Sequence, residues 1–148
     1  MTQRLRRILL VEDSPHDAEL TIEALSENNL VNDIIHVSDG EQALDYLLRR
    51  GKFIDRTNEV PAVVLMDIKM PKVDGIEVLR IMKSTPELMT IPVVMLTSSR
   101  EENDLIGAYK LGVNAYVVKP VDFSAFTQAV SQLGLFWAII NETPGEIR

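Results

Sequence analysis

Hydrophobic residues fall into short runs along the chain, and these runs alternate with segments of helical periodicity. Five of the runs are rich in β-branched residues, and four of those five are almost wholly apolar. Continuous apolar runs are typical of parallel strands that are covered by helices on both faces. The predicted strands are residues 8–11, 34–37, 63–66, 93–96 and 115–118.

The segments between these runs carry apolar residues three and four positions apart, which predicts an amphipathic helix after each strand. Asp39 with Gln42 forms a capping-box pattern at the start of the second helix, and Gly112 is the expected C-terminal stop of the fourth. The apolar stripes are Ala18, Thr21, Ile22 and Leu25; Ala43, Leu44, Leu47 and Leu48; Ile76, Leu79 and Met82; Leu105, Ala108 and Tyr109; and a fifth within residues 122–141.

Five strand-and-helix units predict one doubly wound α/β domain, because right-handed crossovers between parallel strands place helices on both faces of the sheet. The domain is expected to occupy residues 1–148, with a core over about residues 5–141 and a tail at residues 142–148. The connection at residues 51–61 is long and polar, and we expect a solvated loop there.

Composition then narrows the classes of function. The absence of cysteine excludes disulfides, thiolate metal sites and cysteine nucleophiles. A net charge of −7 argues against nonspecific nucleic-acid binding, which usually needs a basic face. The first apolar run ends after four residues, at Glu12, and is too short for a signal peptide or a membrane span. A cytoplasmic protein with no membrane segment is therefore expected.

Polar side chains stand at the carboxyl ends of four predicted strands, where open α/β sheets bind their ligands. They are Glu12 and Asp13 after the first strand, Asp67 after the third, Thr97, Ser98 and Ser99 after the fourth, and Lys119 and Pro120 after the fifth. Carboxylates gathered in one crevice require either a raised pKa or a bound cation, and with oxygen ligands that cation is Mg²⁺. Helix capping by Asp13 or Ser14 is the alternative for a single such residue.

In this order, and each at a strand end, these residues resemble the motif set of the response-regulator receiver domain. The resemblance covers roughly residues 5–141 and implies a flavodoxin-like sheet with the strand order 2-1-3-4-5. It is carried by residues 10–14 (Leu-Val-Glu-Asp-Ser), 64–71 (Val-Leu-Met-Asp-Ile-Lys-Met-Pro), 74–75 (Asp-Gly), 94–98 (Val-Met-Leu-Thr-Ser) and 116–120 (Tyr-Val-Val-Lys-Pro).

The resemblance implies that Asp67 accepts a phosphoryl group and becomes an aspartyl phosphate. Mg²⁺ would be held by Glu12, Asp13, Asp67 and the backbone carbonyl of Lys69, and would offset the charge of the transfer. The remaining implied roles are a hydrogen bond from Thr97 to a phosphoryl oxygen, an ion pair of Lys119 with Asp67 or a phosphoryl oxygen, and a cis peptide bond before Pro120.

A switch is also implied, in which Thr97 moves toward the phosphoryl group and Tyr116 turns inward behind it. For Tyr116 the alternative is an edge aromatic that packs on the sheet. Lys69 and Ser99 occupy variable family positions beside the path of the hydrolytic water. A long cation at Lys69, with no carboxamide or carboxylate at Ser99, predicts slow self-dephosphorylation.

The last predicted helix is apolar on more faces than one sheet can cover. This excess predicts an interaction surface with Phe136, Trp137 and Ile140, and packing under the loop at residues 51–61 is the alternative. Residues 133–142 also resemble a receiver subgroup that includes cyanobacterial phytochrome response regulators. Homodimerisation is the favoured use of this surface.

The predicted function is a response regulator that takes a phosphoryl group from a histidine kinase, phytochrome-like by the subgroup resemblance, or from a phosphotransfer protein. It is expected to be a switch rather than an enzyme, without direct DNA binding and without room for an effector domain. An aspartyl-nucleophile phosphatase is disfavoured because Lys69 stands where its general acid is needed and no cap insertion fits. A binding module that is not phosphorylated is disfavoured by the intact, costly carboxylate cluster.

Overall fold

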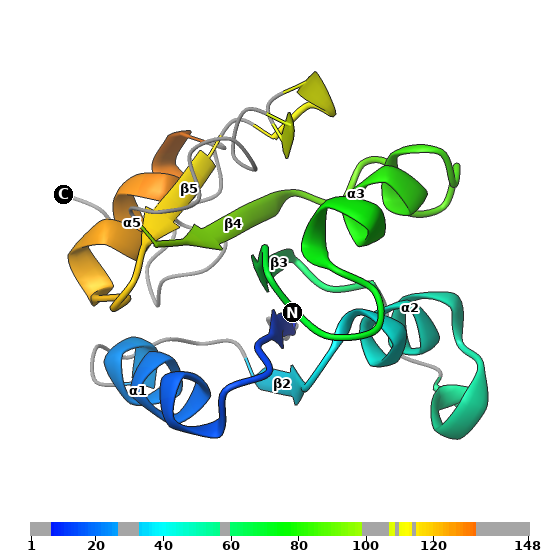
Figure 1. The fold of residues 1–148 in the computed structure, drawn as a ribbon, viewed down its shortest axis with the longest axis horizontal. Helices are drawn as coiled ribbons and strands as arrows, with labels where there is room; N and C mark the ends of the chain where they lie inside the picture. The colour runs from blue at the N-terminus through cyan, green and yellow to red at the C-terminus, as the bar shows by residue number, and fades with distance from the viewer. Residues whose placement is uncertain are drawn as a thin grey trace, which may run out of the picture.

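The computed structural model of the chain describes residues 7–26, 33–56, 60–98, 107–108, 110–113 and 115–132. Its centre is a five-stranded parallel sheet in the order β2-β1-β3-β4-β5 (Figure 1), which confirms the predicted fold class and strand order. The strands are β1 (Ile8–Val11), β2 (Ile34–Val37), β3 (Val63–Asp67), β4 (Val93–Thr97) and β5 (Ala115–Val118). Two strands extend one residue beyond the predicted ends, because Asp67 and Thr97 still pair with Leu96 and Val118 in the ladders.

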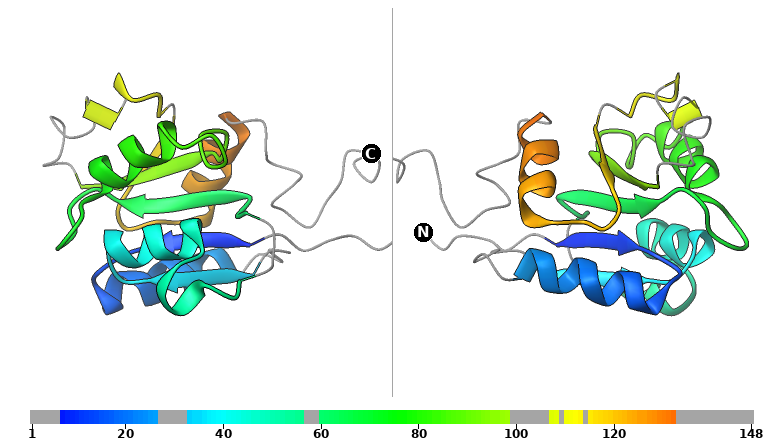
Figure 2. Two further views of the ribbon diagram at one scale, coloured as in Figure 1. Left: turned by 90° about the vertical axis from the view of Figure 1, so that its right-hand side faces the viewer. Right: turned by 60° about the vertical axis from the view of Figure 1, so that its left-hand side comes forward.

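Helices cover both faces of this sheet. Figure 2 shows α1 and α5 together on one side, and α2 and α3 together on the other. These helices are α1 (Pro15–Ser26), α2 (Gly40–Leu48), α3 (Gly75–Lys83) and α5 (Phe123–Gln132). The alternation of side chains along each strand therefore supplies two separate apolar cores, one on each face.

The central strands are buried on both of their faces, which is why their sequences are continuous apolar runs. Every residue of β1, β3 and β4 is buried. The α2–α3 face buries Leu9, Val11, Val64, Met66 and Met95, and the α1–α5 face buries Ile8, Leu10, Leu65, Val94 and Leu96. With each fully buried side chain contributing about 1.5–3 kcal/mol, these two cores hold the ends of the central strands in a fixed position.

Carboxylates fix the first turns of the two helices on one face. Asp39 accepts a hydrogen bond from the backbone N–H of Gln42 at 2.8 Å, and the Gln42 side chain accepts one from Ser38 N at 3.0 Å. The predicted capping box is present, although Gln42 reaches the residue before the cap. Asp74 caps α3 in the same way, by accepting from Glu77 N at 2.9 Å.

The described residues of the predicted loop at 51–61 are largely exposed, as expected of a solvated connection, and they also carry local structure. The loop begins with a 3₁₀ turn, η1 (Gly51–Phe53), and Arg56 Nε donates to the carbonyl of Tyr46 at 2.9 Å. The Arg56 guanidinium also lies 4.6 Å from the centre of the Tyr46 ring. Arg56 thus ties this connection to the carbonyl end of α2, a contact that the sequence did not predict.

Parts of the last two predicted helices lie outside the described residues. Of the fourth, Ala108 is helical and buried, and Gly112 has a φ of 103°, as expected of a helix stop. The described part of the last helix ends at Gln132, so Phe136, Trp137 and Ile140 lie outside it. Among the helices in the described part of the chain, none has the length and apolar character needed to cross a membrane.

Candidate functional site

The predicted site residues meet at the carboxyl end of the sheet. Because β1, β3, β4 and β5 are consecutive neighbours, the residues that end these strands or follow them share one edge. Asp13 is exposed, whereas Glu12, Asp67 and Thr97 are 1%, 4% and 3% exposed. Most of the site's polar groups are therefore held away from water, while Asp13 faces solvent.

Three carboxylates form a tight acidic cluster at this edge. Glu12, Asp13 and Asp67 each place an oxygen within 4.8 Å of the others. Burial and the negative charge of Glu12 raise the pKa of Asp67 from its ordinary value of 3.8 to about 7, although the Lys119 ammonium opposes this rise. At neutral pH, the Asp67 carboxyl is therefore close to the midpoint of its ionisation.

Lys119 supplies the positive charge of the site. Its Nζ lies 2.8 Å from Glu12 Oε1, 3.0 Å from Asp67 Oδ2 and 3.3 Å from Asp17 Oδ2. Burial alone would lower the pKa of the Lys119 ammonium, but its contacts with Glu12 and Asp67 raise that pKa above its usual range. The Lys119–Pro120 peptide bond is cis, as the resemblance implies.

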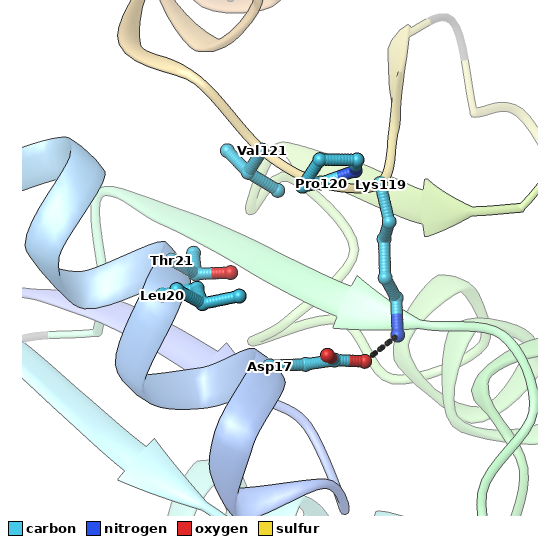
Figure 3. A pocket seen from close by; sticks show the side chains of 6 residues that line it. All are labelled: Asp17, Leu20, Thr21, Lys119, Pro120 and Val121. Atoms are coloured by element: carbon cyan, nitrogen blue, oxygen red, sulfur yellow. Dashed lines mark hydrogen bonds and ion pairs between the residues drawn. The ribbon is translucent and has the colours of Figure 1, made fainter.

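Asp17 was not among the predicted site residues. It lies in the first turn of α1, far from β5 in the sequence, and its carboxylate contacts Lys119 Nζ directly at the edge of a pocket of about 200 Å³ (Figure 3). The pocket is lined by Asp17, Leu20, Thr21, Lys119, Pro120 and Val121. An acidic residue in a first helical turn is usual in any helix, so the sequence carried no signal that distinguished this one.

The chemistry of the donor set fits a hard divalent cation. Oε2 of Glu12 accepts from Ser14 N at 3.1 Å, which orients the carboxylate. Oε1 of Glu12 is buried and, within the described part of the chain, receives no well-aligned hydrogen bond, with the Lys119 ammonium as its ionic neighbour. Three carboxylates against one ammonium leave an excess of negative charge, and oxygen-only donors favour Mg²⁺ or a similar ion. Lys69 lies in the segment after β3 with its side chain exposed.

The two predicted switch residues lie on neighbouring strands. Thr97 ends β4, and its hydroxyl donates to the carbonyl of Ser98 at 3.0 Å. Tyr116 on β5 is 42% exposed, so it lies outward in this structure and not behind Thr97. Ser98 is half-buried, while Ser99 lies outside the described residues. The outward Tyr116 is compatible with both an edge aromatic and the resting position of a switch.

Comparisons with known proteins agree on one family. A family model described as the response regulator receiver domain matches residues 8–131. The solved structure of the bacteriophytochrome response regulator AtBRR is 56% identical, with a TM-score of 0.87 over 95% of this chain and 100% of that one. The crystal structure of the phosphorylated cyanobacterial phytochrome response regulator RcpA is 37% identical, with a TM-score of 0.75 over 91% of this chain and 95% of that one.

A third relative is known from both sequence and structure. The response regulator Rcp1 of Synechocystis sp. is 38% identical over 130 residues, which cover 88% of this chain and 87% of Rcp1. A crystal structure of the Mn²⁺-bound form of Rcp1 is 37% identical, with a TM-score of 0.72 over 89% of this chain and 94% of that one.

The raised pKa of Asp67 predicts a pH-dependent cost in stability when no divalent cation is present. The folded protein holds the Asp67 proton more tightly than the unfolded chain, so the free energy of unfolding falls as the pH rises from about 4 to about 7. We expect Asp67→Asn to exceed the unsubstituted protein in stability by about 2–4 kcal/mol above pH 7.5 and by little near pH 4.

Urea unfolding in EDTA at a series of pH values measures this difference. Asp55→Asn is the matched control for the loss of one carboxylate, because Asp55 is exposed and lies after η1, outside the acidic cluster. If Asp67→Asn and the unsubstituted protein differ in free energy of unfolding by the same amount from pH 4 to pH 8, the pKa of Asp67 is not raised in the folded protein.

Proposed function

The chain belongs to the response regulator receiver domain family, and on that premise we propose that it is a phosphorylatable switch whose phosphoryl acceptor is Asp67. One observation carries the proposal: the buried Asp67 ends a central strand with Lys119 Nζ at 3.0 Å and two further carboxylates beside it. A carboxylate in these surroundings is both a nucleophile and a potential metal ligand.

The chain's own residues supply most of what the transfer needs. An Asp67 oxygen forms the new bond to phosphorus while the phosphorus–nitrogen bond of a phosphohistidine breaks, and the leaving imidazole keeps that electron pair. Lys119 offsets the added charge, and the Thr97 hydroxyl on the next strand rotates from the Ser98 carbonyl to donate to a phosphoryl oxygen. Mg²⁺, held by Glu12, Asp13, Asp67 and the Lys69 carbonyl, would screen the carboxylates from the phosphoryl group.

The relatives support both the metal and the modification. Rcp1 has a Mn²⁺-bound form, and RcpA has a phosphorylated one. The phosphoryl donor is proposed to be a histidine kinase or a phosphotransfer protein in the cytoplasm. The names of AtBRR and RcpA favour a phytochrome-like kinase, because both are described as response regulators of phytochromes.

Incubation with acetyl phosphate and Mg²⁺ tests the acceptor. We expect close to one phosphoryl group per chain, measured by intact-protein mass spectrometry, and none on Asp67→Asn or when EDTA replaces Mg²⁺. The matched control is Asp55→Asn, which should be labelled like the unsubstituted protein because Asp55 is exposed in the connection after η1. Continuous release of inorganic phosphate would instead identify a phosphatase, and no labelling at all would identify a binding module.

The label is also expected to persist. Lys69 places a long cation beside the predicted path of the hydrolytic water, so loss of phosphate should take minutes or longer in the absence of a phosphatase. Lys69→Met keeps the length of the side chain and removes its charge, and it should shorten the lifetime if the charge matters. Mass spectrometry after removal of acetyl phosphate measures the rate at which the label is lost. Loss from the unsubstituted protein within seconds would refute slow self-dephosphorylation.

We further propose that the protein forms a homodimer through a surface that includes Phe136, Trp137 and Ile140. The support is the apolar excess of this segment and its resemblance to a phytochrome-linked subgroup. Sedimentation velocity should show a dimer that Trp137→Ser weakens by at least tenfold, since aromatic anchors dominate many interfaces. A monomer at high concentration, with or without acetyl phosphate, would remove the proposal.

A further inference from the structure

We propose that the junction between β2 and α2, residues 36–41, supports the metal site by holding the segment between β3 and α3, residues 68–74. This contact would keep the segment in the shape that offers the Lys69 carbonyl to the cation. Gly40 in the junction and Lys72 in the segment are the positioning residues. This inference rests on the proposed function, because it concerns the same site.

The segment between β3 and α3 is closed at its base. Gly75 begins α3, and its N–H donates to the carbonyl of Ile68 at 2.8 Å. A Cβ on Gly75 would lie 2.3 Å from the carbonyl oxygen of Asp67, so only glycine permits this approach. The segment thus leaves the end of β3 and returns to it. These contacts fix only its two ends, so its middle residues depend on contacts with another element.

That support comes from the first turn of α2. The segment passes beside this helix in Figure 1, and Gly40 is buried there. A Cβ on Gly40 would lie 1.9 Å from the carbonyl oxygen of Val73 and 2.7 Å from its carbonyl carbon. Two stretches of backbone are therefore packed with no room for a methyl group, and any larger residue must push the segment away from α2.

An ion pair on the protein surface also joins the segment to the start of α2. Lys72 has a left-handed backbone with φ of 67°, which is uncommon for a residue with a side chain. Its Nζ lies 3.4 Å from Glu41 Oε1 and 3.8 Å from Asp39 Oδ2. Asp39 also caps α2 through its other oxygen, so one buried carboxylate serves both the helix and the segment.

The same junction also contacts the other segment that bears metal ligands. The backbone N–H of Glu12 donates to the carbonyl of Val37 at 3.1 Å, and His36 Nε2 donates to the carbonyl of Glu12 at 2.8 Å. The β2–α2 junction therefore contacts both stretches that carry predicted ligands. Residues of this kind, which orient ligands without binding the metal, commonly change metal affinity by about 10- to 100-fold.

Mg²⁺ affinity of the full chain, measured by NMR titration of its amide signals, tests the inference. Gly40→Ala should weaken Mg²⁺ binding by about tenfold. Lys72→Glu should weaken it by about threefold, because the pair it disrupts is largely exposed. Charge alone would predict the opposite, since an added negative charge attracts Mg²⁺. Glu41→Lys combined with Lys72→Glu restores the pair between these two positions with reversed signs. It should recover most of the affinity that Lys72→Glu loses, although Asp39 then faces a like charge.

Lys52→Glu is the matched control for charge, because Lys52 is an exposed lysine in η1 and not part of the segment. It should bind Mg²⁺ as tightly as the unsubstituted protein or more tightly. The rate of labelling by acetyl phosphate adds a second readout: in the Gly40 and Lys72 variants, saturating Mg²⁺ should restore it, since only the metal ligand is displaced.

The outcomes separate the two proposals. If the unsubstituted protein binds no Mg²⁺, the proposed function fails. If it binds Mg²⁺ and Lys72→Glu binds as tightly as Lys52→Glu, or the charge reversal brings no recovery, the proposed function stands and this inference is overturned. Should Gly40→Ala not fold, the Lys72 variants decide the matter, because Lys72 is 60% exposed.

Discussion

The contact between the Lys119 ammonium and the buried carboxylates of Glu12 and Asp67 is the interaction on which the site depends. Two carboxylates so close together, and nearly excluded from water, repel each other and favour protonation. One ammonium at 2.8 and 3.0 Å offsets part of that repulsion, yet the pKa of Asp67 is still raised to about 7. The remaining excess of negative charge on the acidic cluster of Glu12, Asp13 and Asp67 favours binding of a divalent cation.

The doubly wound sheet makes this arrangement possible. Two apolar cores fix the central strands from both faces, so the polar groups at the strand ends cannot move apart to relieve their repulsion. The free energy of packing in the two cores therefore offsets the repulsion between the carboxylates.

Neighbouring elements contact the site through both side chains and backbone. α1 adds Asp17 as a third carboxylate partner of Lys119, and the β2–α2 junction contacts both Glu12 and the segment after β3. The site and the segment after β3 therefore contact elements on both faces of the sheet, namely α1 on one face and α2 on the other.

The sequence by itself determined the local features: the five strands as apolar runs, the cap at Asp39, and the polar residues Glu12, Asp13, Asp67, Thr97 and Lys119 at strand ends. These follow from periodicity and from the fact that parallel strands end at one edge. Tertiary structure alone decided which partners arrive from elsewhere. Asp17 pairs with Lys119, which is 102 positions away in the sequence, and Gly40 packs against the backbone of Val73. Arg56 donates a hydrogen bond to the carbonyl of Tyr46 in α2. An acidic residue in a helix, a glycine or an arginine in a loop has many possible roles, and only packing in three dimensions selects one.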